Sequence, residues 1–489
     1  MLLPRTLLCL AQAWLVLADT QLVLNQLQTV SATTSPLTYS LPTSQRPVSV
    51  SVALCSYQQS ATPRFFVSNG SVMSPGPDDL GEDVFELELD GYSLGNLTVQ
   101  VTSSGVLAVY NATDMSFEVG VSDDGPMHQV LDELPLFSDS TANQVLMFSP
   151  PFSPPSISAP SYPNYTLPAA NQTFPPEPPS PPEYSLFIAA TTSSAFMTLP
   201  RTGCAFRGSA NNVGRLLASA QSEGLWLRDT GGWRWQWFVN GLVPMTNYTV
   251  YAVKNETQVT APIYFSTKSP AFACPIVYGL PFCPSIGYAA PLGNDDPATG
   301  VTATELPSAF TDNLISGLTN FTVMLTTLAC GRDLYSPIVT CADCQAAYRN
   351  WLCIVSLPRC AEYTSTTSSS AAATSTSTSM FGQGTAQEPL ITPTPALAVQ
   401  NASSPRNPNL PPFAKNYTAV LPCLEVCYGA DRACPPFLGF QCPLPQYTAG
   451  QSYGVGYVDT GEEGVVGGGM TGAGTDQWGN VWCNGPGVV

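Results

Sequence analysis

Fifteen cysteines and a single histidine are the features of this 489-residue chain that bear most directly on chemistry. Nine of the cysteines lie either between Cys330 and Cys360 or between Pro422 and Cys442. Cysteines at this density act either as metal ligands or as a disulfide framework. The lone histidine, His128, leaves few ways to build a zinc site or a general base, because most such sites use histidine.

Paired carboxylates are the other possible source of catalysis. Asp295-Asp296 and Glu462-Glu463 could serve glycoside hydrolysis in principle, but adjacent residues point to different sides of the backbone. Six acidic residues from Asp79 to Asp90 could bind calcium, yet they lack the ligand spacing of an EF-hand. We therefore interpret that cluster as a solvated face, and we expect no catalytic residue, cofactor or metal.

The N-terminus predicts a secretory signal peptide over residues 1–18. Arg5 supplies the positive end, Leu7 to Leu17 the apolar core, and Ala18 ends a small-residue cleavage site. An uncleaved membrane anchor is the alternative, although the apolar run is short for a spanning helix. Cleavage would remove Cys9 and leave fourteen cysteines, an even number.

Sequons for asparagine-linked glycosylation occur along the whole chain. Their asparagines are Asn69, Asn96, Asn111, Asn164, Asn171, Asn247, Asn255, Asn320, Asn401 and Asn416. Together with the signal peptide they indicate a glycoprotein of the secretory pathway, at the extracellular face of the plasma membrane or in the endoplasmic reticulum lumen. In that oxidising compartment cysteines pair, so the disulfide interpretation is favoured over the metal one.

Charge narrows the choice of partners. The chain has 16 basic and 34 acidic residues, a net charge of −18. Such a field disfavours nucleic acid and anionic lipid headgroups. After the signal peptide we find no uninterrupted apolar run of about 18 residues, so we expect no later segment to cross a bilayer.

The first half of the chain is predicted to consist of β-strands. Val48–Leu54, Val84–Asp90 and Leu97–Val101 alternate apolar and polar residues, which is typical of half-buried strands. With turn residues between them, they predict a jelly-roll-like β-sandwich over residues 21–149. Thirteen prolines between Pro150 and Pro182 predict a linker over residues 150–183.

A second β-domain is expected over residues 184–268. Its segment Gly241–Tyr248 resembles the tyrosine corner of fibronectin III-like sandwiches, in which the tyrosine hydroxyl bonds to the backbone of the corner. Trp233, Trp235 and Trp237 would share one face of a strand. That arrangement favours a packed core over a sugar-binding platform.

From Cys274 onward the apolar spacing becomes helical, and we expect a cysteine-rich domain over residues 270–483. A helix is predicted around Tyr348, with Asp343 as its cap. Serine, threonine, alanine and proline dominate the sequence after Cys360, and this composition predicts a disordered insertion over residues 361–413. A mobile Gly-rich tail is expected over residues 450–489, anchored only near Trp478 to Cys483.

The cysteine order from Cys274 onward resembles a mainly helical, frizzled-like cysteine-rich domain. Cys344 lies nine residues before Cys353, which ends a Trp-Leu-Cys run, and Pro358-Arg-Cys360 follows. If the pairing of that family applies, the bonds are Cys274–Cys360, Cys283–Cys353, Cys344–Cys434, Cys427–Cys442 and Cys423–Cys483. Cys330 and Cys341 would then form an extra pair, leaving Cys55 and Cys204 to bond across or within the β-domains.

Two sequence blocks resemble the fungal stretch-activated calcium-channel component family. They are Cys341-Ala-Asp-Cys-Gln-Ala-Ala-Tyr-Arg-Asn-Trp-Leu-Cys353 and Leu421-Pro-Cys-Leu-Glu-Val-Cys427. The cysteine-rich part is also similar to the ectodomain of the auxiliary subunit of the animal sodium leak channel. The resemblance implies a non-enzymatic regulatory subunit, peripheral to the outer membrane face. Such a subunit would join the pore-forming subunit of a voltage-gated-like calcium channel and support stress- or stretch-linked calcium influx.

Docking contacts are expected among exposed residues of this region, and a homo-oligomer is compatible with it. The candidates are Arg332, Asp333, Tyr348, Arg349, Trp351 and Arg359. Tyr348 and Trp351 also fit the core of a helix bundle. One alternative function is a secreted or cell-surface cysteine-rich glycoprotein that binds a lipid or another ligand. A wall hydrolase or adhesin is a third class, suggested by the Ser/Thr and Pro tracts.

Overall fold

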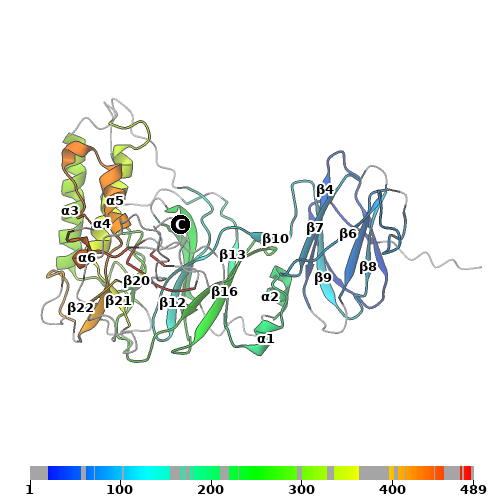
Figure 1. Cartoon of the computed structure of the whole chain (residues 1–489), viewed down its shortest axis with the longest axis horizontal. Helices are drawn as coiled ribbons and strands as arrows, with labels where there is room; N and C mark the ends of the chain where they lie inside the picture. The colour runs from blue at the N-terminus through cyan, green and yellow to red at the C-terminus, as the bar shows by residue number, and fades with distance from the viewer. Residues whose placement is uncertain are drawn as a thin grey trace, which may run out of the picture. The chain divides into compact units, whose positions relative to one another are not determined.

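The chain forms two compact units, which are distinguished by the contacts within each. Unit 1 comprises Met1–Val130 and Thr198–Gly208, and unit 2 comprises Leu131–Met197 and Ser209–Val489 (Figure 1). The computed structural model describes residues 20–56, 62–70, 72–101, 104–154, 167, 169–170, 177–178, 180–209, 220–228, 231–293, 300–327, 335–362, 396–400, 406–413, 415–444, 447–455, 474–475 and 478–485. The expected signal peptide lies outside these residues.

Unit 1 is a sandwich of two β-sheets. One sheet has the strand order β1-β3-β8-β5-β6 and the other has the order β2-β9-β4-β7. The strands are β1 (Thr20–Gln21), β2 (Gln26–Ser31), β3 (Leu37–Leu41), β4 (Val48–Leu54), β5 (Arg64–Ser68), β6 (Val84–Leu87), β7 (Leu94–Val99), β8 (Gly105–Tyr110) and β9 (Ser116–Ser122). The apolar residues of both sheets meet in one buried core.

Strand β4 has the bounds that the sequence predicts, but all seven of its residues are buried. The expected half-buried strand is wrong because its polar face is covered as well. Ser51 donates a hydrogen bond to the Gly120 carbonyl at 3.4 Å and lies 3.1 Å from Nδ1 of His128. Buried serines need such partners, and here the only histidine of the chain supplies one.

Unit 2 begins with a second sandwich. One sheet has the order β11-β12-β15-β14, and in the other β16 pairs with β13, β17 and β18. The strands are β11 (Leu136–Ser140), β12 (Gln144–Phe148), β13 (Tyr184–Ala190), β14 (Ala220–Leu227), β15 (Trp233–Asn240), β16 (Asn247–Lys254), β17 (Gln258–Thr260) and β18 (Ile263–Ser266). Between β9 and β11 lies β10 (Gln129–Leu131), and α1 (Ser194–Met197) and α2 (Gly203–Ser209) follow β13.

This arrangement corrects the expected domain boundaries. Strand β12 pairs with β15 across the proline-rich stretch, so residues 136–148 belong to the second sandwich rather than the first. The chain then returns to unit 1 at Thr198–Gly208. The stretch expected as a linker also contributes packing, because Phe152 contacts the core of the second sandwich and Ala170 is buried among cysteine-rich residues. Strand pairing and apolar burial therefore override the compositional boundary.

The tyrosine corner is present. The backbone N–H of Val243 donates a hydrogen bond to the Tyr248 hydroxyl at 2.8 Å, as the motif predicts. Trp237 is buried in the same core and Trp235 packs against it, which confirms the core interpretation of the tryptophans. Trp233 is buried too.

The cysteine-rich part combines three main helices with small sheets (Figure 1). The helices are α3 (Ser308–Thr327), α4 (Cys341–Ser356), α5 (Leu424–Ala433), the 3-10 helix η3 (Pro436–Leu438) and α6 (Ala449–Ser452). Strands β19 (Ile276–Val277) and β20 (Tyr288–Ala289) pair with each other. Strands β21 (Arg359–Ala361), β22 (Leu397–Gln400) and β23 (Tyr417–Val420) form a sheet of order β21-β23-β22.

The expected disordered insertion over residues 361–413 is too long at its C-terminal end. Residues 397–400 form β22, which pairs with β23, and Leu410 is buried. The cause is local apolar sequence, Leu397-Ala-Val, which a purely compositional interpretation overlooks. Within the described residues, we find no helix that is long and apolar enough to cross a membrane.

Candidate functional site

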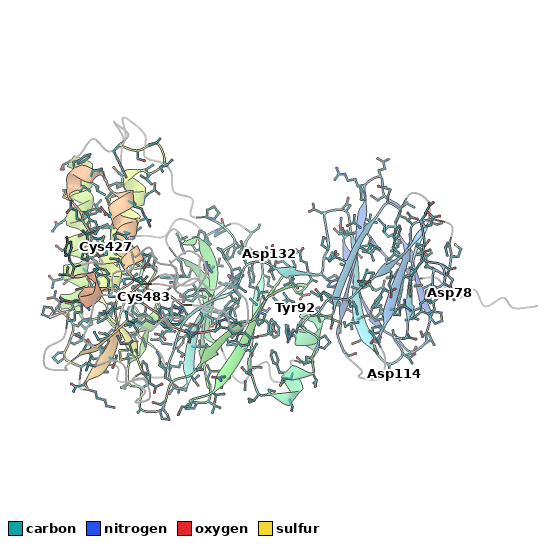
Figure 2. The ribbon with its side chains drawn as sticks, in the orientation of Figure 1. Asp78, Tyr92, Asp114, Asp132, Cys427 and Cys483 are labelled. Carbon is teal, nitrogen blue, oxygen red and sulfur yellow. A yellow bond between two sulfur atoms is a disulfide. The ribbon has the colours of Figure 1, made fainter. Side chains whose placement is uncertain are left out.

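Disulfides hold the cysteine-rich part together. The pairs that the structure describes there are Cys274–Cys360, Cys283–Cys353, Cys344–Cys434, Cys423–Cys483 and Cys427–Cys442. They coincide with the pairs that the frizzled-type resemblance implies. Cys341 is also disulfide-bonded, and its expected partner Cys330 lies outside the described residues. Figure 2 shows Cys427 on α5 and Cys483 near the end of the described chain.

Helix α4 is the element around which the framework closes. It starts with a capping box, in which Thr340 accepts a hydrogen bond from the Asp343 N–H and Asp343 accepts one from the Thr340 N–H. Asp343 is thus the third helical residue rather than the expected cap, because the helix begins earlier than the apolar spacing around Tyr348 indicates. Cys344 and Cys353 on this helix tie it to Cys434 and Cys283.

The aromatic side chains of α4 face neighbouring helices. The Tyr348 ring stacks on Phe321 with 3.6 Å between ring centroids, and Trp351 lies edge-to-face with Phe440 at 5.0 Å. The Trp351 indole N–H donates to the Tyr453 hydroxyl at 2.9 Å. Tyr348 thus takes part in the packing between α3 and α4 and is half-buried, and its expected contact with a partner stays a prediction.

The two expected docking arginines that the structure describes are buried, not exposed. Arg349 is buried on α4, within the packed face of the helix. Arg359 donates from Nε to Asp139 at 3.0 Å and from Nη2 to the Ser138 carbonyl at 2.7 Å. Arg359 therefore has a structural role, since it binds a carboxylate that lies 220 residues away in the sequence. Arg332 and Asp333 lie outside the described residues.

Asp139 is the centre of a buried ionic cluster in unit 2. Besides Arg359, it accepts hydrogen bonds from Nζ of Lys268 at 2.8 Å and from the Ala289 N–H at 3.0 Å. Burial would raise the pKa of Asp139, but the charges of Arg359 and Lys268 hold that pKa below its usual range. Burial lowers the pKa of Lys268 despite the carboxylate beside it. The cluster joins the second sandwich to the cysteine-rich part.

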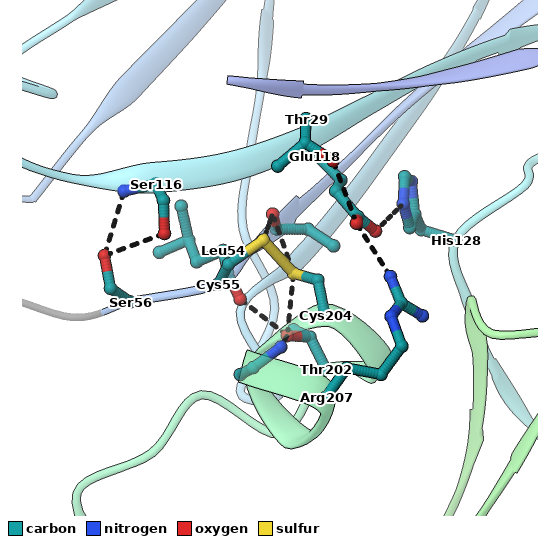
Figure 3. Close-up of a disulfide and its surroundings, with 12 residues drawn as sticks. Thr29, Leu54, Cys55, Ser56, Ser116, Glu118, His128, Thr202, Cys204 and Arg207 are labelled. Atoms are coloured by element: carbon teal, nitrogen blue, oxygen red, sulfur yellow. Dashed lines mark hydrogen bonds and ion pairs between the residues drawn. A yellow bond between two sulfur atoms is a disulfide. The ribbon is translucent and has the colours of Figure 1, made fainter. Parts of the chain in front are cut away.

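A comparable cluster lies in unit 1, beside the Cys55–Cys204 disulfide (Figure 3). Buried Glu118 accepts a hydrogen bond from Nη2 of Arg207 at 2.7 Å, and its other carboxylate oxygen lies 3.6 Å from Nε2 of His128. Burial would raise the pKa of Glu118, but contacts with His128 and Arg207 hold that pKa below its usual range. Glu118, Cys204 and Arg207 therefore fasten residues 198–208 to the second sheet.

The disulfides limit which of the described side chains could hold a metal ion. Among the described residues, two sets lie close enough to share an ion, Cys55–Glu118–Cys204 and Cys423–Glu425–Cys483. In each set the two cysteines are bonded to each other, so their sulfurs are not thiolate ligands. The acidic stretch Asp79–Asp90 forms no such set within those residues, and Glu86 instead pairs with Arg64. Asp295-Asp296 and Glu462-Glu463 lie outside the described chain.

The sequons are mostly accessible where the structure describes them. Asn69 is half-buried, and the exposed ones are Asn96, Asn111, Asn247, Asn255, Asn320 and Asn416. Asn164, Asn171 and Asn401 lie outside the described residues.

Sequence reasoning missed an apolar surface at one end of the helices. Phe321, Leu325, Cys344 and Cys434 form a buried cluster where α3 ends, α4 begins and α5 ends. On the elements of this cluster or beside them, four large apolar residues are exposed: Val323 and Met324 on α3, Ile338 before α4 at 87%, and Phe437 on η3 at 63%. We call these four residues the helical end patch. Val323 and Met324 are neighbours on α3, whereas Ile338 and Phe437 come from segments distant in sequence.

Comparison with known proteins gives a family. Residues 40–468 match the family described as "Stretch-activated Ca2+-permeable channel component". The chain belongs to this family. The match includes both cysteine blocks and most of the two units.

Individual relatives agree with the family assignment. "Stretch-activated cation channel MID1" of Cryptococcus neoformans var. grubii is 34% identical over 437 residues, covering 83% of this chain and 65% of the relative. "Stretch-activated cation channel yam8" of Schizosaccharomyces pombe is 28% identical, covering 56% and 52%. "Stretch-activated cation channel MID1" of Saccharomyces cerevisiae is 30% identical, covering 46% and 38%. The chain thus spans less than two thirds of the length of these relatives.

Proposed function

We propose that this channel-component family member is a non-enzymatic, extracellular regulatory subunit that binds the pore-forming subunit of a voltage-gated-like calcium channel. It would support stress- or stretch-linked calcium influx. The names of the relatives, which are stretch-activated cation channels, support the channel role. The predicted signal peptide, the ten sequons and the disulfides support an extracellular placement.

The observation that carries the proposal is the helical end patch. Exposed apolar side chains that cluster on a rigid support are typical of protein interaction sites. Here the Cys344–Cys434 disulfide and the capping box of α4 fix the support, so little order has to be gained on binding. The patch replaces the buried Arg349 and Arg359 as our candidate docking surface.

The finer domain assignments belong to the same proposal. We retain a jelly-roll-like unit 1, a fibronectin III-like sandwich in unit 2 and a frizzled-like arrangement of α3, α4 and α5. The tyrosine corner supports the second assignment, and the disulfide pairs support the third.

The test is affinity purification of the full chain from gentle detergent, together with calcium influx in cells that lack the endogenous protein. Ile338→Asp and Phe437→Asp should each reduce recovery of a multi-span channel at least tenfold and lower influx in parallel. Met73→Asp is the matched control, because Met73 is an equally exposed apolar residue of unit 1. Unchanged channel recovery with both patch variants would remove the docking surface. Normal calcium influx without the protein would contradict the channel role itself.

A further inference from the structure

An open pocket of about 490 Å³ lies at one end of the β21-β23-β22 sheet, beside the Cys274–Cys360 disulfide. Its lining includes Ser269, Phe272, Cys274, Glu362, Phe413 and Asn416–Thr418, together with Val399. Its size is within the range of small-molecule sites. All of these residues belong to unit 2.

A glycosylation sequon forms part of this pocket. Asn416 and Thr418, the two defining residues of the sequon Asn416-Tyr417-Thr418, both line it. Asn416 is exposed, so an oligosaccharide transferase can reach its amide. A glycan on that amide would begin inside the pocket, since the first sugar is bonded to the asparagine side chain.

The pocket wall suits the apolar face of a sugar. Phe413, three residues before the sequon, and Phe272 both line the pocket, and C–H groups of a pyranose pack well on aromatic rings. Val399 is 74% exposed and lies directly opposite Thr418 in the β22–β23 pair, so it shares a face of the sheet with the sequon. Without a covering group these apolar side chains meet water.

Polar features fit an uncharged ligand. The pocket holds one carboxylate, Glu362, and one ammonium, Lys415, which balance. The wall residue Tyr417 is 8% exposed, and its hydroxyl has no hydrogen-bond partner in the described chain.

We propose that the first N-acetylglucosamine of a glycan on Asn416 occupies this pocket and packs on Phe413 and Val399. The inference rests on the proposed passage of the chain through the secretory pathway. It sets Asn416 apart from the other sequons. Asn69 also follows a phenylalanine by three residues, but Phe66 is fully buried and its ring is unavailable to a glycan.

The test uses the secreted full-length chain. Glycopeptide mass spectrometry first reads the occupancy of every sequon. Thermal unfolding is then followed by tryptophan fluorescence, which reports unit 2 because every tryptophan except Trp14 lies there. Trimming all glycans to one N-acetylglucosamine should leave the midpoint of thermal unfolding unchanged, because the sugar proposed to fill the pocket is retained. Asn416→Gln should lower it by about 2–4 °C, the shift expected of a modest contact in a domain of this size.

Two variants separate the pocket from a general effect of glycans. Asn96→Gln removes an exposed sequon on β7 of unit 1 and should leave the midpoint of unit 2 unchanged. Phe413→Ala should lower the midpoint in the glycosylated chain, and by clearly less in the Asn416→Gln background. Equal losses in both backgrounds would overturn the inference, because Phe413 would then act without the sugar.

The remaining outcomes are also decisive. An empty Asn416 in a chain glycosylated elsewhere overturns the pocket assignment and leaves the extracellular placement standing. A chain without glycan at any sequon overturns that placement, and the inference with it. A free small molecule that copurifies with Asn416→Gln and restores its midpoint would show that the pocket takes an independent ligand instead.

Discussion

Two buried carboxylates fasten distant segments, Glu118 in unit 1 and Asp139 in unit 2, but they are satisfied to different degrees. Asp139 is bound by two cations, Lys268 and Arg359, and by the Ala289 N–H. Glu118 has one cation, Arg207, at hydrogen-bond distance, and its second oxygen has no hydrogen-bond partner in the described chain. His128 stands 3.6 Å from that oxygen.

The two carboxylates also differ in the segments that they connect. Asp139 connects the second sandwich to β21, the strand that follows α4. Glu118 holds only the short return segment 198–208, which a disulfide also secures. Glu118 has a single close cation, and the Cys55–Cys204 disulfide holds the same segment covalently.

The largest effect is expected from Asp139→Asn. The amide would leave Lys268 and Arg359 buried without a counter-charge, which costs about 3–5 kcal/mol. Guanidinium unfolding followed by tryptophan fluorescence measures the change in unit 2. Asp312→Asn, at an exposed position of α3, should leave the midpoint unchanged. Equal midpoints for the two variants would show that the ionic joint contributes nothing.

The next largest effect is expected from removing the Cys55–Cys204 disulfide of unit 1. Replacing both Cys55 and Cys204 by serine should lower the free energy of opening of residues 198–208 by about 2–4 kcal/mol. The sandwich should keep its protection, because its core lies between the two sheets. Hydrogen exchange of peptides from both regions distinguishes these outcomes. Global loss of protection in unit 1 would mean that the segment is integral to the sandwich.

A smaller effect is expected from Glu118→Gln, about 1–3 kcal/mol at neutral pH, since the hydrogen bond from the half-buried Arg207 to the buried Glu118 loses its negative partner. Because the folded-state pKa of Glu118 is lowered, its contribution is present above the pKa of an ordinary glutamate. It is lost as the pH falls through the folded value. The gap between wild type and variant should therefore close in acid.

The single histidine offers the readout for this titration. Since His128 is the single histidine of the chain, its ring C–H resonances are assigned without ambiguity, and the loss of the folded-state signals of unit 1 with denaturant can be followed by NMR at each pH. Glu88→Gln, at an exposed carboxylate of the same unit, is the control and should follow wild type. A gap that persists unchanged at low pH would contradict the assignment of the acid-sensitive group.

Local patterns were sufficient for elements but not for long-range partners. Alternation places β4 correctly, and the tyrosine corner is visible in ten residues of sequence. Nothing near Arg359 indicates Asp139, because the two lie 220 residues apart and each looks like an ordinary surface charge. The same reason explains why Arg359 was expected to dock a partner.

The predicted domain boundaries differ from the observed units for a related reason. The proline-rich stretch is a real change in composition, yet β12 before it pairs with β15 after it. Strand pairing depends on complementary faces that no single segment reveals. The helical end patch was missed likewise, since Val323, Ile338 and Phe437 are unremarkable one by one.

The Cys55–Cys204 bond has a consequence for the order of synthesis. Its cysteines lie 149 residues apart, and strands β11, β12 and β13 of unit 2 are made between them. At roughly 5–20 residues per second, the ribosome needs on the order of ten seconds to bridge that gap. During this interval Cys55 has no partner, so unit 1 cannot close this disulfide until the first strands of unit 2 have already been made.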